Sequence, residues 1–187
     1  MASCTADLIV KIMRQSLSCH PDTPCDAVTG IAVEVTYTPR GDLQLEYSMT
    51  GDIAAVRLPP PAISARADNL WQHTCFEAFI RSAPDGAGYH EFNFSPSTQW
   101  AAYRFAAYRA GMAAADAAPH VETRVTATVF ELRAVLALPS TSAAALLALS
   151  AVIEETSGRK SYWALAHPPG KPDFHHPDCF SFELPPA

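Results

Sequence analysis

The sequence of 187 residues is poor in positive charge and has no apolar run long enough to cross a bilayer. Only three lysines occur, Lys11, Lys160 and Lys171, and the formal net charge is −6. Nucleic acids and anionic membrane surfaces both attract clustered basic residues, so neither is an expected partner. A spanning helix needs about 20 apolar residues, and the first residues lack the basic start of a signal peptide. These features predict a cytoplasmic location.

The common sequence motifs of enzymes are also missing. There is no GxGxxG or Walker A loop for phosphates and no GxSxG nucleophile elbow. Five cysteines at irregular spacing do not suggest a disulfide framework, and Cys19-His20 with Cys25 lacks the second pair of a four-ligand zinc site. His73 and Cys75 have no third residue to orient them for nucleophilic catalysis. We therefore expect a binding protein rather than an enzyme, without a nucleotide cofactor.

What the sequence contains instead is short apolar segments. Hydrophobic residues make up 49% of the chain, and 16 prolines and 8 glycines divide it into pieces of strand length. Roughly ten short strands predict an all-β fold, an antiparallel β-sandwich of immunoglobulin-like or jelly-roll-like type, with one or two short helices. The length fits one domain over residues 1–187, in which 1–29 form an N-terminal strand and loop. The expected strands are 8–13, 30–38, 43–50, 53–58, 71–81, 89–94, 99–108 (which also fits a helix), 121–129, 131–138, 148–155, 161–167 and 178–184, and the expected helix is Ser140–Leu149.

The densest group of polar and aromatic residues lies in residues 70–105. Segments 71–81 and 89–94 alternate and flank the turn sequence SAPDGAG, so they predict a hairpin. With a symmetric turn, the expected pairs are Glu77 with Asn93 and Phe79 with Glu91. Alternation sends one apolar set towards a core between two sheets. That set is Phe76, Ala78, Ile80, Phe92 and Phe94.

The opposite face of this hairpin is polar and aromatic, and it has two interpretations. It is either an ordinary solvated surface or a concave face that binds a ligand. Large aromatics on a polar face are typical platforms for flat apolar surfaces such as sugar rings, which favours the second interpretation. The candidate ligand-binding residues are Trp71, His73, Glu77, Glu91, Asn93, Trp100, Tyr103, Trp163 and His167.

The hairpin sequence also resembles a known family. The run WQHTCFEAFI at 71–80, followed by YHEFNFSPS at 89–97, is similar to the DOMON-like superfamily and the related family 9 carbohydrate-binding modules. Segments 100–109, 161–168 and 171–180 resemble a bacterial group within that superfamily. Glu77, Phe79, Glu91, Phe92 and Pro96 match its strand patterns. The resemblance implies a β-sandwich that binds a small carbohydrate or haem without catalysis, with haem ligands available in His73, His167 and Met112.

Three further hypotheses remain open from the residues. His167, Asp173, His175 and His176 lie within ten residues of one another, and these residue types are metal ligands, so a metal-dependent enzyme is one alternative. Glu77 and Glu91 form a candidate carboxylate pair for glycoside hydrolysis. An exposed sheet edge offers a route to a homodimer, because unpaired strand groups can pair with a second chain.

Overall fold

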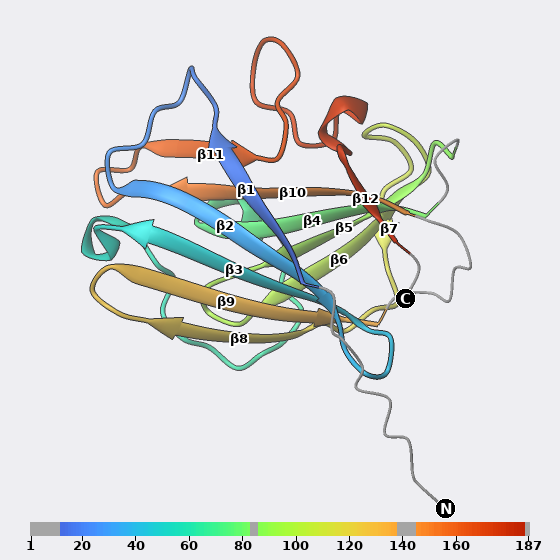
Figure 1. The fold of residues 1–187 in the computed structure, drawn as a ribbon, viewed down its shortest axis with the longest axis horizontal. Helices are drawn as coiled ribbons and strands as arrows, with labels where there is room; N and C mark the ends of the chain where they lie inside the picture. The colour runs from blue at the N-terminus through green and yellow to red at the C-terminus, as the bar shows by residue number, and fades with distance from the viewer. Residues whose placement is uncertain (1–11, 83–85, 138–144, 186–187) are drawn as a thin grey trace, which may run out of the picture.

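The structure, a computed structural model, describes residues 12–82, 86–137 and 145–185. Within these ranges all paired strands are antiparallel, and helical turns are limited to three short 3-10 segments, none long and apolar enough to span a membrane. The prediction of an all-β antiparallel fold is confirmed (Figure 1). The strands are β1 (Met13–Cys19), β2 (Val28–Tyr37), β3 (Leu43–Gly51), β4 (Cys75–Arg81), β5 (Tyr89–Phe94), β6 (Trp100–Phe105), β7 (Ala113–Ala114), β8 (His120–Val125), β9 (Val129–Leu136), β10 (Ala145–Glu154), β11 (Lys160–Ala164) and β12 (Phe182–Leu184).

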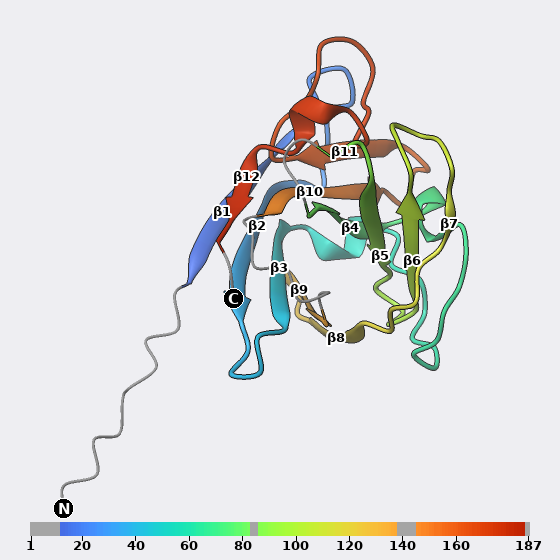
Figure 2. The same ribbon diagram turned by 90° about the vertical axis from the view of Figure 1, so that its right-hand side faces the viewer.

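The strands form two curved sheets that share an edge at β1. The first sheet has the order β1-β2-β3-β9-β8, and the second has β11-β10-β4-β5-β6-β7, with β12 paired to the start of β10. β1 pairs with β2 from Met13 to Leu17 and then with β11 at Ser18 and Cys19. It therefore crosses from one sheet to the other, and the two sheets curl around a common interior (Figures 1 and 2).

The main core fills the space between the sheets. The Phe76 ring of β4 stacks on Phe130 of β9 with ring centroids 5.6 Å apart, and Tyr47 of β3 packs against Phe76 at 5.2 Å. The Tyr47 hydroxyl donates to the backbone carbonyl of Glu77 at 2.8 Å, so its polar end is satisfied despite full burial. The predicted inward-facing set of the hairpin lies in this core: Phe76, Ala78, Ile80, Phe92 and Phe94.

The predicted register of the β4–β5 hairpin is also confirmed. Glu77 lies opposite Asn93, and Phe79 lies opposite Glu91. On the next strand, Tyr103 lies opposite Glu91. Because side chains alternate across a strand, these residues share the face of the second sheet that points away from the main core.

The predicted helix at Ser140–Leu149 is wrong over its described part. Residues 145–149 begin strand β10, and residues 138–144 lie outside the described residues. Leu147 and Leu149 point into the main core, while Ala148 packs in a second apolar cluster on the other face. That cluster includes Phe174 and Phe180 from the connection after β11. A strand covered on both faces has no polar alternation, so its sequence resembles that of a buried helix.

Other boundaries differ from the sequence prediction. Residues 53–58 form a 3-10 turn, Ile53–Ala55, followed by an isolated bridge at Val56, and not a strand. Trp71 lies in a second 3-10 turn, Leu70–Gln72, before β4 begins at Cys75. The expected strand at 8–13 falls mostly outside the described residues.

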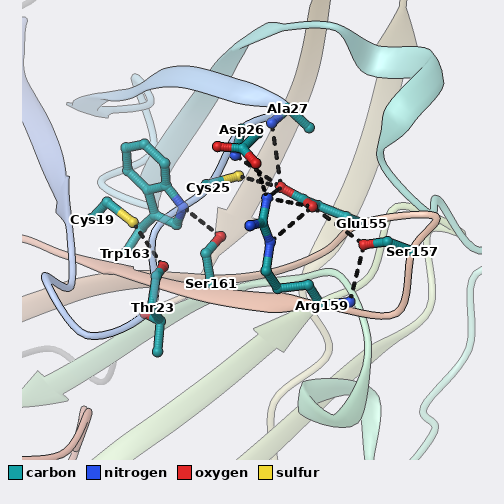
Figure 3. A network of polar contacts seen from close by, with 10 residues as sticks. All are labelled: Cys19, Thr23, Cys25, Asp26, Ala27, Glu155, Ser157, Arg159, Ser161 and Trp163. Carbon is teal, nitrogen blue, oxygen red and sulfur yellow. Dashed lines mark hydrogen bonds and ion pairs between the residues drawn. The ribbon is translucent and has the colours of Figure 1, made fainter.

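The loop between β1 and β2 is fixed to the turn after β10 by one carboxylate (Figure 3). Glu155 accepts hydrogen bonds from the backbone N–H groups of Asp26 at 2.9 Å and Ala27 at 3.3 Å. The Arg159 guanidinium contacts both Glu155 oxygens and, with these N–H groups, lowers the pKa of Glu155 to about 2. Cys25 donates its thiol proton to the same carboxylate at 3.4 Å. These contacts hold the loop between β1 and β2 against the turn after β10, which is a structural role.

Candidate functional site

A groove of about 920 Å³ lies on the face of the second sheet that points away from the main core. Its floor is formed by Glu77 and Phe79 of β4, Glu91 of β5, and Tyr103 and Phe105 of β6. Strand pairing brings these floor residues together, because Glu91 lies between Phe79 on one neighbouring strand and Tyr103 on the other. A groove of this volume can hold a small molecule.

Two buried carboxyl groups make up the polar part of this floor. One Glu77 oxygen accepts from the Ser150 hydroxyl at 3.1 Å, and one Glu91 oxygen accepts from the Asn93 amide at 2.7 Å. Burial, followed by the negative charge of Glu91, raises the pKa of Glu77 to about 8. Burial also raises the pKa of Glu91. The pair therefore retains a proton at neutral pH and can both donate and accept hydrogen bonds.

One wall of the groove comes from the segment that precedes β4. The Arg66 guanidinium donates to the Ala102 carbonyl at 2.8 Å and lies over the Tyr103 ring, 5.0 Å from its centroid. Asp68 pairs with Arg66 at 3.1 Å and accepts from the Tyr103 hydroxyl at 2.6 Å. Trp71 lines the groove with 49% of its surface exposed. The anchored segment thus presents a flat indole beside a polar floor.

The opposite wall joins the loop after β6 to the connection after β11. The Arg109 guanidinium pairs with Asp173 at 2.7 Å, which ties the two segments together. His175 Nδ1 lies 2.7 Å from the Tyr89 hydroxyl, and its Nε2 lies 3.8 Å from a Glu91 oxygen. Burial and the positive charge of Arg109 lower the pKa of His175 to about 4. The imidazole is therefore neutral at neutral pH.

Five of the predicted ligand-binding residues lie at or directly beneath the groove. Trp71, Glu77, Glu91 and Tyr103 line it. Asn93 is completely buried and supports the floor through its hydrogen bond to Glu91. The structure therefore brings these residues together, Trp71 from a 3-10 turn and the others from strands, while their role in binding stays a prediction.

The other two tryptophans do not lie on this face, so the predicted platform is wrong in part. Trp100 lies opposite Phe94, a main-core residue, and packs against that core itself. Trp163 is 6% exposed in the same core, where its indole N–H donates to the Ser161 hydroxyl at 3.0 Å. Both side chains alternate towards the main core in their strands. Trp71 is the tryptophan that lines the groove.

Two predicted histidines also lie elsewhere. His73 Nδ1 contacts the buried Glu154 carboxylate at 2.7 Å, and His167 Nε2 contacts the Ser18 carbonyl at 2.8 Å. Of the three residues suggested as haem ligands, Met112 is the one that lines the groove. The suggested metal ligands are likewise not gathered: among the described residues, no three His, Cys, Asp or Glu side chains are arranged to hold a metal.

Several residues of the groove were not predicted as site residues from the sequence. Arg66, Asp68, Arg109 and Phe174 line or support the walls, and His175 was considered only as a metal ligand. All of them lie outside the strands, in connections that show no periodic pattern. Nothing local in the sequence indicates that residues 66–71 and 172–175 frame the same strands.

A second hollow, of about 670 Å³, lies on the outer face of the first sheet. Its lining alternates in charge, with Glu34, Glu46 and Arg133 among its residues. Arg133 pairs with Glu46 at 3.7 Å, so these charges neutralise one another. The one aromatic side chain that lines it, Tyr47, is 1% exposed. This face has the features of a solvated charged surface.

Comparison with known proteins yields matches to solved structures. No family model and no curated protein sequence matches the chain. A family 9 carbohydrate-binding module from Caldicellulosiruptor kristjanssonii in complex with cellotriose superimposes with a TM-score of 0.57 at 12% identity, covering 94% of this chain and 84% of the module. A structure described as that kind of module from the same organism, in complex with glucose, gives 0.53 at 13% identity, over 95% and 84%.

A proposed carbohydrate-binding protein from Bacteroides uniformis gives a TM-score of 0.63 at 16% identity, covering 90% of this chain and 84% of that protein. At these identities the likeness establishes a shared fold. This chain therefore has the fold of those family 9 carbohydrate-binding modules, and its relation to that family and to the wider DOMON-like superfamily stays a prediction.

Proposed function

We propose that the protein binds a small carbohydrate in the 920 Å³ groove, and that it acts by binding rather than by catalysis. One observation carries the proposal: an exposed indole, Trp71, borders a floor of buried hydrogen-bonding groups, Glu77 and Glu91. A sugar ring has an apolar face of C–H groups and a rim of hydroxyls, so it needs both kinds of surface. The fold shared with modules solved in complex with cellotriose and glucose supports the same ligand class.

Each part of the groove has a role in this proposal. Trp71 stacks against the apolar face of a ring, and the Glu77–Glu91 floor exchanges hydrogen bonds with its hydroxyls. Arg66 and Arg109 supply charged donors from the two walls, and their pairing with Asp68 and Asp173 holds them in position without leaving free positive charge. The groove binds through groups that are already ordered, which limits the entropy lost on association.

Calorimetric titration with glucose and cellotriose tests the proposal. Trp71→Ala is expected to weaken binding at least about fivefold, because stacking on an aromatic contributes roughly 1 kcal/mol or more. Trp71→Phe should recover part of that loss. Ile63→Ala is the matched control, since Ile63 is 88% exposed and does not line the groove.

Two results would reject the proposal. The first is the absence of binding by any sugar across a panel that includes glucose and cellotriose. The second is sugar binding that Trp71→Ala leaves unchanged, which would place the ligand away from the groove.

A further inference from the structure

The charges in the groove do not balance at its floor. Arg66 pairs with Asp68 and Arg109 with Asp173, so both guanidinium groups already have a carboxylate partner. Among the described residues, neither Glu77 nor Glu91 forms an ion pair with a lysine or arginine. The imidazole of His175, 3.8 Å from Glu91, is the ionisable base that contacts the pair.

The positive charge of Arg109 acts on both carboxyl groups and opposes the rise of their pKa values, but burial outweighs it. Burial together with Arg109 lowers the pKa of His175 to about 4, so it stays neutral at the pH of a cell. Cys75 and the Tyr47 hydroxyl, whose pKa values are raised by burial and by Glu77, are also neutral there. Ser150 and Asn93 each satisfy one carboxyl oxygen. Glu77 and Glu91 are more than nine-tenths buried and line the groove, and among the described residues no lysine or arginine is paired directly with either.

We propose that the groove selects a basic sugar, one whose ring carries a protonated primary amine, over the neutral sugar of the same size. This inference rests on the proposed carbohydrate binding at the same site. The ammonium group supplies a directly paired counter-ion and three hydrogen-bond donors to two carboxylates that otherwise share a proton. In a floor shielded from water, such a pair is stronger than at an exposed surface. A hydroxyl or an acetamido group at the same ring position supplies no charge.

Titration with glucose, glucosamine and N-acetylglucosamine tests this inference, because the three differ only at one ring substituent. At about pH 6, where the amine is protonated, glucosamine should bind at least about tenfold tighter than the other two, as expected for a charged hydrogen bond. Glu77→Gln and Glu91→Gln should each reduce that ratio towards unity. Glu131→Gln, on an exposed position of β9, should leave it unchanged.

The outcomes separate this inference from the proposed function. If glucose binds with dependence on Trp71 but glucosamine binds no tighter, the amine preference is wrong and carbohydrate binding stands. If glucosamine is preferred but both glutamine variants keep the full ratio, the assignment to Glu77 and Glu91 is wrong. If none of the three sugars binds, a failure also seen with cellotriose rejects the proposed function and the inference with it.

Discussion

Two glutamates show how differently the same side chain behaves in this fold. Glu155 is surrounded by donors, Arg159 and two backbone N–H groups, and its pKa falls to about 2. Glu77 is buried beside Glu91 with a single hydroxyl donor, and its pKa rises to about 8. The first arrangement stabilises the folded chain at neutral pH, whereas the second destabilises it. Such a cost at the floor of a groove is typical of a functional site.

The cost at Glu77 gives a pH-dependent prediction. The unfolded side chain titrates near 4.5 and the folded one near 8, so the folded state holds more protons in that window and stability falls as pH rises through it. Glu77→Gln keeps an acceptor for Ser150 but cannot ionise. Its melting temperature should therefore exceed that of the wild type by about 3 °C or more at pH 9, and the gain should shrink towards pH 4.5.

Thermal unfolding followed by circular dichroism at several pH values measures this difference. Glu131→Gln, with its exposed side chain, provides the control and should show no such trend. A Glu77→Gln variant that is less stable than the wild type at every pH would contradict the assigned burial cost.

At the scale of elements, sequence alternation predicted the parts of the sheet that have one core-facing side. The β4–β5 hairpin has mainly apolar side chains on its core face, whereas its other face mixes Glu77, Glu91 and Asn93 with aromatics, and this contrast indicates both its register and its inward set. The start of β10 was wrongly predicted as a helix because the connection after β11 covers the second face of this strand. That contact joins residues far apart in the chain, so local sequence does not indicate it. The same connection forms a wall of the groove, so the sequence predicted Trp71 and the carboxyl groups of the floor but not the wall that comes from residues 172–175.

The burial of β10 on both faces leads to a stability prediction. Leu149 is 1% exposed in the main core, between strands β4 and β11. Leu149→Ala should lower the free energy of unfolding by about 2–5 kcal/mol, because it leaves a cavity in a packed interior. Leu146→Ala, at a half-buried position of the same strand, should have a clearly smaller effect. Denaturant unfolding measures both, and equal losses would contradict the packing described for β10.

At the scale of the whole molecule, the two sheets present different outer surfaces. The first carries compensating charges around Glu46 and Arg133, and its edge strand β8 has exposed charged residues that discourage pairing with another chain. The expected dimer through a sheet edge stays a prediction. The second sheet carries the groove, whose walls come from three connections after β3, β6 and β11. The outer faces of the two sheets therefore differ: one carries paired charges, and the other carries a groove with an exposed indole.

The most direct test of this account is to map a bound sugar on the folded chain. Backbone amide shifts from two-dimensional NMR, recorded while glucose, cellotriose or glucosamine is added, report which segments respond. We expect the changes to gather at residues 66–71, at 109–114 and at 172–175, together with the Trp71 indole signal. Changes centred instead on Glu34, Glu46 and Arg133 of the first sheet, or no change with any of the three sugars, would contradict it.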